Sequence, residues 1–308
     1  IFPHTQDETK YLFEFESRFD KLEAWPKDPM RDNEAFMLEA LKFAETMPQK
    51  PVVIAHHPSR SATALGKYGL TSPKELRSWN DTAPDIAVGM EGAPGHQAAE
   101  LSKTEKNTIY PAWVFARGAY GRGYPTLGGF DQMTARVGGF WDSMLAEGRR
   151  WWVTANSDSH IHYTEGGIDF WPGEYSKTYV HAIKEHADIL DGIRQGRVFV
   201  TTGDLVSELY LTVSQESSQA AMGGELSLKD GQLIEVLVRL KDPDNKNSAG
   251  RNPSVARVDL IVGELTGLGK NLDRDEHKSV QVVKRFTREN WKEKNGYTVM
   301  RHSLRLDG

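Results

Sequence analysis

The chain has 308 residues and a formal net charge of −5, and 38% of its residues are hydrophobic and 26% charged. This composition is sufficient for a folded core and excludes general disorder, and so mild a charge gives no reason to expect a nucleic-acid or membrane-surface binder. Cysteine is absent, which excludes disulfide scaffolds, cysteine-ligated metals and thiol nucleophiles, so any metal site must use histidine, aspartate or glutamate.

The first two thirds of the chain alternate between helical and strand patterns. Helical spacing covers residues 32–47, a stretch starting at 72, and residues 130–145 and 187–195. Buried strands are predicted at residues 51–55, 86–90, 151–155, 179–182 and 197–201. The second helix begins with a capping box and Pro73, and glycines at 148 and 196 end two of the others. Such alternation is typical of a parallel sheet or an α/β barrel.

After about residue 205 the pattern changes to strands separated by polar turns. The strand patterns cover residues 209–213, 233–240, 255–262, 280–286 and 297–306. Helical patterning is nearly absent there, which predicts a small antiparallel β-domain of the sandwich type. We therefore predict an α/β domain over residues 1–205 and a β-rich accessory domain over 206–308.

Three of the buried strands run directly into side chains that bind metals in other proteins. These candidates are His56 and His57 after the first strand, Glu91 and His96 after the second, and Asp158 and His160 after the third. In an α/β barrel the C-terminal ends of the strands converge on one face, where active sites are built. Asp158 and His160 are two residues apart, so in an extended stretch both point to the same side and can reach one cation.

Each candidate also has a purely structural interpretation. A single histidine after a strand is usually a hydrogen-bonded loop residue, although Pro58 helps to fix the turn that holds His56 and His57. Asp158 can instead form an Asx turn, and Glu91 can be a buried carboxylate paired with an arginine. The joint occurrence of these residues at three strand ends favours a shared metal site.

The strand-end segments resemble the PHP superfamily, named for polymerase and histidinol phosphatase domains. Residues 55–58 (Ala-His-His-Pro) are similar to its (A/N)HP motif, and residues 156–160 (Asn-Ser-Asp-Ser-His) to its closing Asp-x-His motif. The segment 179–203 resembles the strand–helix–strand end of many PHP phosphoesterases. The most similar layout is the carbaryl-hydrolase-like branch, which carries a trailing β-domain. The resemblance covers residues 50–205 well and the β-domain by layout alone.

The resemblance implies a distorted (β/α)7 TIM-like barrel that holds two or three divalent cations, usually Mn, Zn or Fe. It implies hydrolysis of a phosphate or related ester by metal-activated water. By position His57, Asp158 and His160 match the family's catalytic site, and either Glu91 or His96 falls where it places another ligand. The family opens with a His-x-His motif that does not precede residue 56, so we expect the N-terminal part of the barrel to be missing or the site to be degenerate.

Three arginines are candidates for binding an anionic substrate. Arg60 follows the His-Pro turn, and Arg117 and Arg122 flank a glycine-rich stretch that lacks the Lys-Ser/Thr pair of a phosphate-binding P-loop. An arginine fork binds two oxygens of a phosphate-like group at once and keeps its charge at any working pH. The alternative is a solvated glycine loop whose arginines pair with surface carboxylates.

Two classes of function follow from these features. The first is a metal-dependent hydrolase of a small-molecule phosphoester or, at the same site, of a carbamate or carboxylic ester. The second is a non-catalytic binding protein, a degenerate barrel with a carbohydrate- or protein-binding β-domain, favoured by the missing His-x-His and by Trp171 and Tyr175. No apolar run approaches the roughly 18–20 residues that span a bilayer. We expect no nucleic-acid partner, and a periplasmic or extracellular location is slightly favoured because related layouts are often exported.

Overall fold

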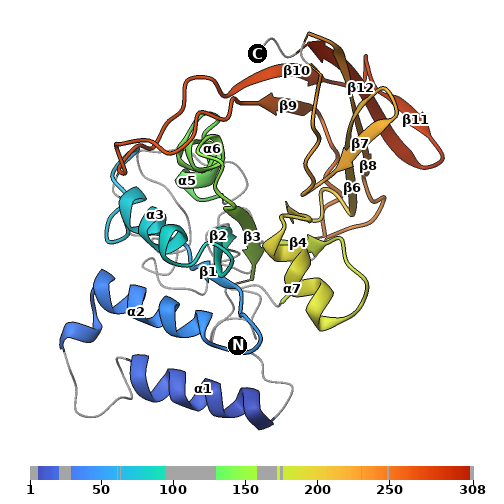
Figure 1. Ribbon diagram of the computed structural model, residues 1–308. Helices are drawn as coiled ribbons and strands as arrows, with labels where there is room; N and C mark the ends of the chain where they lie inside the picture. The colour runs from blue at the N-terminus through green and yellow to red at the C-terminus, as the bar shows by residue number, and fades with distance from the viewer. Residues whose placement is uncertain are drawn as a thin grey trace.

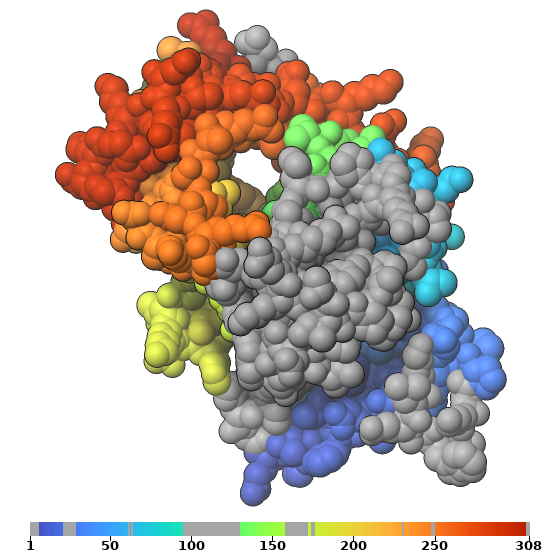
Figure 2. Space-filling model, turned by 180° about the vertical axis from the view of Figure 1, so that it is seen from behind, coloured from blue at the N-terminus to red at the C-terminus, as the bar shows by residue number. Residues whose placement is uncertain are grey.

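The computed structural model describes residues 6–20, 29–60, 62, 64–94, 130–157, 172–173, 176–229, 231–247 and 250–305. An α/β part has its last strand end at Thr202, and a β-rich part has its first strand begin at Glu208 (Figure 1). Figure 2 shows from behind that the β-rich part, in orange to red, and the N-terminal helices, in blue, lie at opposite ends of the molecule. Within these residues no helix combines the length and apolarity that crossing a lipid bilayer requires.

Two helices and a short 3-10 turn form the N-terminal end. They are α1 (Gln6–Phe19), η1 (Pro29–Arg31) and α2 (Glu34–Glu45). Asn33 caps α2, because its side-chain oxygen accepts a hydrogen bond from the backbone N–H of Phe36 at 2.9 Å. Helix α1 was not predicted from the sequence. It packs on α2 through aromatic rings, and the ring of Phe19 lies 5.4 Å from that of Phe36 and 5.6 Å from that of Phe43.

A three-stranded sheet in the order β1-β2-β3 forms the centre of the α/β part. Its strands are β1 (Val53–Ala55), β2 (Ala87–Pro94) and β3 (Trp152–Asn156). Both strand pairs are parallel, which confirms the parallel pairing predicted for these three segments. All eight residues of β2 are buried, as expected for a central strand that is covered on both faces.

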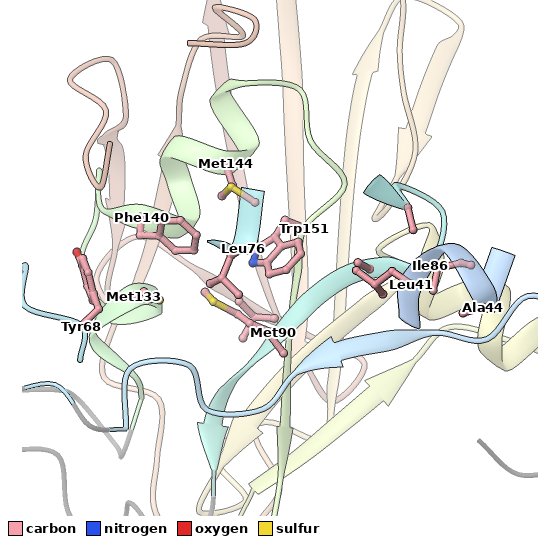
Figure 3. Close-up of a cluster of buried hydrophobic side chains, with 14 residues drawn as sticks. Leu41, Ala44, Tyr68, Leu76, Ile86, Met90, Met133, Phe140, Met144 and Trp151 are labelled. Carbon is pink, nitrogen blue, oxygen red and sulfur yellow. The ribbon is translucent and has the colours of Figure 1, made fainter. Parts of the chain in front are cut away.

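Short helices cover this sheet and enclose a hydrophobic core. They are α3 (Pro73–Thr82), α5 (Gln132–Ala135) and α6 (Phe140–Ala146). Figure 3 shows side chains from these helices and from the sheet gathering in one cluster. Its members with at most 1% exposure include Leu41, Leu76, Met90, Phe140, Met144 and Trp151.

Of two helices predicted from the sequence, one is confirmed and one is wrong. Helix α3 begins where the sequence predicts, whereas the segment after residue 130 does not form the single helix that we expected. The Ser72 side chain accepts a hydrogen bond from the Glu75 N–H at 3.1 Å, and Pro73 occupies the first turn. This segment instead contains α5 and α6, separated by residues 136–139, which include Gly138 and Gly139. Gly138 has a φ of 71°, in the left-handed region that helical backbone does not use, so the prediction of one continuous helix is wrong.

The next two strands pair in the opposite sense to the prediction. Strands β4 (Ser176–Val180) and β5 (Val198–Thr202) flank α7 (His186–Arg194) and pair antiparallel, where the alternating pattern predicted a parallel sheet. Strand β4 approaches β3 through a side chain. The Thr178 hydroxyl accepts a hydrogen bond from the Ala155 N–H at 2.8 Å and donates to the Ala155 carbonyl oxygen at 2.7 Å. The hydroxyl thus binds the N–H and the carbonyl oxygen of Ala155, which a further parallel strand beside β3 would otherwise use.

The β-rich part contains two antiparallel sheets. The five-stranded sheet has the order β11-β12-β8-β6-β7, and the two-stranded sheet joins β10 and β9. Their strands are β6 (Glu208–Gln215), β7 (Ser218–Ala221), β8 (Leu233–Lys241), β9 (Val258–Val262), β10 (Gln281–Phe286), β11 (Lys292–Lys294) and β12 (Tyr297–Arg305). The sequence did not predict β7 or β11.

Alternation along β8 shows how the two antiparallel sheets share one core. Every second residue of β8 is buried, namely Ile234, Val236, Val238 and Leu240, and the residues between them are more exposed. This is expected for a strand with one face covered. Val236, Val238 and Leu240 pack with Met300 of β12 and with Phe286 of β10, both of which are almost fully buried.

The connection between β9 and β10, residues 263–280, returns from the β-rich part to the helices of the α/β part (Figure 1). The Tyr68 hydroxyl donates to Asp275 at 2.6 Å. The backbone N–H of His277 donates to the Gly138 carbonyl oxygen at 2.7 Å, and that of Thr266 to the Ala146 carbonyl oxygen at 2.7 Å. The two parts of the chain are therefore joined by hydrogen bonds well away from residue 205.

A buried carboxylate lies beneath this connection. The Glu147 side chain is 1% exposed and accepts hydrogen bonds from three arginines. Arg77 of α3 donates through Nη2 at 2.9 Å, Arg149 through Nε at 2.6 Å, and Arg274 of the connection through Nη2 at 2.9 Å. Burial by itself raises the pKa of Glu147, but the hydrogen bonds from Arg77 and Arg149 outweigh it and hold the pKa below its usual value.

Candidate metal centre

Two histidines and one glutamate meet at the ends of the first two parallel strands. His56 and His57 directly follow β1, and Glu91 lies in β2. In the strand register Ala55 pairs with Met90, so the residues that follow each of them are brought side by side. One potential ligand atom from each of His56, His57 and Glu91 lies within 4.8 Å of the other two.

The turn after β1 has an uncommon backbone conformation at His57. Its φ is 28°, in the left-handed region that residues other than glycine rarely use. The His57 carbonyl oxygen accepts a hydrogen bond from the Arg60 N–H at 3.0 Å, which closes a tight turn through Pro58. The ring centroids of His56 and His57 are 4.0 Å apart, with an interplanar angle of 49°. Backbone conformations of this kind cluster at functional sites.

Glu91 is almost completely buried, with a side-chain exposure of 1%. The pairing of β2 with β3 shifts register between Glu91 and Ala93, which identifies a β-bulge at Gly92. A Cβ atom at Gly92 would lie 2.5 Å from Thr134 Oγ1 and 2.6 Å from Val153 Cγ1, so only glycine fits this bulge. The bulge interrupts the regular alternation of the strand next to Glu91.

Among the residues that the structure describes, the carboxylate of Glu91 lacks the hydrogen bonds that a buried acid normally receives. Oε2 lies 2.8 Å from Nδ1 of His56. Apart from this salt-bridge contact, neither carboxylate oxygen has a hydrogen-bond partner among the described residues. A buried carboxylate without donors is costly, and a bound cation would remove this cost. The donor set of two imidazoles and one carboxylate therefore fits a divalent metal ion.

The structure thus brings together three of the six residues that the sequence identified as metal ligands. In the described part of the chain Glu91 forms a salt-bridge contact with His56. Arg60 is exposed and lies beside this group, with Nη1 at 3.4 Å from Nε2 of His57. The other predicted site residues lie outside the described residues, namely His96, Arg117, Arg122, Asp158 and His160, as do Trp171 and Tyr175. Their roles stay predictions.

Two further buried residues at this site were not identified from the sequence. Ser59 and Asp131 are both 0% exposed, and both the N–H and the hydroxyl of Ser59 donate to the Asp131 carboxylate. The only sequence signal was indirect, because an aspartate at the start of the helical pattern after residue 130 is a typical N-cap. Nothing in the sequence connects it to a serine 72 positions earlier.

The chain matches no protein-family model, no curated protein and no solved structure. The resemblance to the PHP superfamily therefore stays a hypothesis that depends on the strand-end motifs. The geometry of His56, His57 and Glu91 is an independent observation, because it comes from the packing of β1 against β2 and not from a motif.

Proposed function

We propose that this protein is a metal-dependent hydrolase of small-molecule phosphoesters, and that His56, His57 and Glu91 form part of its metal site. The observation that supports this most strongly is the meeting, at adjacent strand ends, of two imidazoles and a buried carboxylate that has no hydrogen-bond donor among the described residues. Nitrogen and oxygen donors of this kind suit Mn, Zn or Fe. Three protein ligands are also the usual number in catalytic zinc sites, which keep one position open.

The proposed site extends to Asp158 and His160. Strand β3 lies next to β2 in the sheet and ends at Asn156, two residues before Asp158. The carboxyl ends of parallel strands meet at one edge, so this placement supports Asp158 and His160 as further ligands of the same or a neighbouring ion. We propose a PHP-type (β/α)7 barrel as the fold, with β1, β2 and β3 as three of its strands.

Each residue of the site has a distinct chemical task. A divalent cation would supply a Lewis acid there and lower the pKa of a water molecule. Glu91 contributes negative charge from a position that water does not reach, and the two histidines contribute neutral nitrogen donors. Arg60 is exposed beside His57, where its guanidinium can bind two oxygens of an anionic substrate and orient it.

The metal requirement gives the first test. We expect the purified full chain to contain Mn, Zn or Fe, to lose hydrolysis of an aryl phosphate when treated with a chelator, and to regain it when one of these metals is returned. The measurement is elemental analysis by mass spectrometry together with hydrolysis assays. A folded, metal-free protein whose properties do not change on adding these metals would contradict the proposal and favour the non-catalytic binding protein.

Arg60 gives a test of the substrate class. We expect Arg60→Ala to lower kcat/KM for an aryl phosphate about 10–100-fold, because a hydrogen bond to a charged group contributes about 1.5–3 kcal/mol. For a neutral aryl acetate kcat/KM should change less than about twofold, since that ester has no anionic oxygens for the fork to bind.

Arg60→Lys is the matched control, because it keeps the charge and removes the fork; its loss on the aryl phosphate should fall between those of the wild type and Arg60→Ala. An equal loss on both esters would show that Arg60 supports the site without selecting a substrate. Faster hydrolysis of the acetate by the wild-type protein would favour the carboxylic ester or carbamate alternative.

A further inference from the structure

Asp131 holds the turn that carries the two histidines. It is completely buried and lies directly before α5. Its Oδ2 accepts a hydrogen bond from the Ser59 N–H at 3.1 Å, and its Oδ1 accepts one from the Ser59 hydroxyl. Ser59 is also completely buried and lies two residues after His57. Both oxygens of the Asp131 carboxylate therefore bind the same turn.

The backbone of Asp131 is bound to the second ligand-bearing segment. Its N–H donates to the carbonyl oxygen of Gly92 at 2.7 Å. Gly92 follows Glu91 and lies in the β-bulge described above. One residue thus joins the turn after β1 through its side chain and the bulge in β2 through its backbone. These are the two places from which the metal-binding side chains come.

We propose that Asp131 is a positioning residue for the metal centre, which sets the separation between the His56–His57 turn and Glu91 and thereby the affinity for the metal. This inference rests on the proposed function, because it assumes that these three residues bind a cation. Hydrogen bonds to an ionised acceptor are strong in a buried setting, so the Asp131 carboxylate is well suited to hold a turn in place. Groups that orient metal ligands typically affect metal affinity 10–100-fold.

The backbone of His57 gives a physical reason for such a residue. A φ of 28° is unfavourable for histidine and persists only where the surrounding structure imposes it. The turn contributes the Arg60 N–H bond to the His57 carbonyl oxygen, and the Ala62 N–H donates to the Ser59 carbonyl oxygen at 3.0 Å. The hydrogen bonds to Asp131 tie this turn to the rest of the protein. Without them we expect His57 to relax toward ordinary backbone angles and its ring to leave the site.

The test is the variant Asp131→Asn in the full chain. Asparagine keeps the shape and one acceptor oxygen, but its amide NH2 cannot accept the bond from the Ser59 N–H or hydroxyl that it faces. We expect the Kd for Mn²⁺, measured by calorimetry after chelation, to rise about 10–100-fold. The circular dichroism spectrum should be unchanged, and saturating Mn²⁺ should bring kcat back to within a few-fold of the wild type.

A control must separate positioning from the loss of a helix cap, because Asp131 also caps α5 through the Met133 N–H at 2.7 Å. Ser72→Ala removes the matching cap of α3, where the Ser72 hydroxyl oxygen accepts from the Glu75 N–H at 3.1 Å. We expect it to leave the Kd for Mn²⁺ within about twofold of the wild type. Ser59→Ala removes only the hydrogen bond from the hydroxyl, so its Kd for Mn²⁺ should lie between those of Ser72→Ala and Asp131→Asn.

The outcomes distinguish this inference from the proposed function. If the wild-type chain binds neither Mn²⁺ nor Zn²⁺, the proposed function fails, and this inference with it. If the wild type binds and Asp131→Asn binds equally tightly, the positioning role is refuted while the metal site stands. Equal weakening by Asp131→Asn and Ser72→Ala would also refute it. Should Asp131→Asn not fold, the Kd of Ser59→Ala decides, and an unchanged value overturns the inference.

Discussion

Glu147→Gln is expected to lower the free energy of unfolding by about 3–5 kcal/mol, which is the usual cost of removing one partner of a buried ion pair. Glutamine fills the same space, so no cavity adds to the effect. It leaves Arg77, whose side chain is 0% exposed, and Arg149, whose side chain is 4% exposed, without the charge that they surround. Urea denaturation at neutral pH, followed by circular dichroism, measures the change.

The matched control is Glu235→Gln on the surface of the β-rich part. Glu235 pairs with Arg301, and their side chains are 46% and 58% exposed. An exposed pair contributes about 0–1 kcal/mol, so this variant should unfold close to the wild type. If the free energy of unfolding falls by the same small amount in both variants, the cluster of Glu147 with its arginines does not stabilise the fold in the way that its geometry indicates.

The pH dependence of Glu147→Gln gives a second measurement on the same variant. The pKa of Glu147 is lowered from the usual 4.5, so the unfolded chain takes up its proton at a higher pH than the folded protein. The stability that the carboxylate contributes is therefore fully present above about pH 4.5 and is lost as the pH falls through the folded-state pKa. We expect the difference between the wild type and Glu147→Gln to shrink below about pH 4.5, and a constant difference would contradict this.

Glu91→Gln, unlike Glu147→Gln, is expected to leave the stability of the metal-free protein undiminished. It should instead cause a large loss of metal binding. The Glu91 carboxylate is buried, its salt-bridge contact among the described residues is with the exposed His56, and neither of its oxygens has a hydrogen-bond donor there, so removing its charge relieves a desolvation cost. The same charge attracts the cation, so the affinity for Mn²⁺ should fall at least about 100-fold.

The expected result can be read without an activity assay. A ligand present at 100 times its Kd raises the free energy of unfolding by about 2.7 kcal/mol. Mn²⁺ at 100 times the wild-type Kd should therefore raise the urea midpoint of the wild type and of Glu235→Gln. It should stabilise Glu91→Gln by no more than about 0.4 kcal/mol, because the same concentration is then at most about one Kd of that variant. Metal binding by Glu91→Gln as tight as that of the wild type would remove Glu91 from the site.

The sequence was sufficient to predict the parts of the fold that local patterns determine. Buried apolar runs predicted β1, β2 and β3, and the Ser72 capping box marked the start of α3. The pairing of β4 with β5 was predicted in the wrong sense, because the hydrophobic pattern of a strand does not encode the direction of its partner strand. Helix α1 has no buried residue, so its pattern was weak, and its contacts with α2 come from tertiary packing.

At the candidate site, too, the sequence predicted what local patterns determine and not what tertiary contacts impose. His56, His57 and Glu91 were identifiable because each stands next to or within a strand that the sequence predicts, and parallel strands bring their ends together. The bond between Ser59 and Asp131 was not identifiable, because two polar side chains 72 positions apart show no pattern of their own. The His57 backbone conformation was equally hidden, since it arises from a turn that tertiary contacts impose.

The connection formed by residues 263–280 also has a consequence for how the chain folds during synthesis. Arg77 donates to the Leu272 carbonyl oxygen, 195 positions later, at 2.9 Å, and Tyr68 bonds to Asp275, 207 positions later. Until the ribosome has released these residues, Glu147 lacks Arg274 and the surface around α3 stays uncovered. A fragment that ends near residue 205 should therefore expose this surface and aggregate, even though the pattern change there resembles a domain boundary. A stable N-terminal half would therefore need to include this connection.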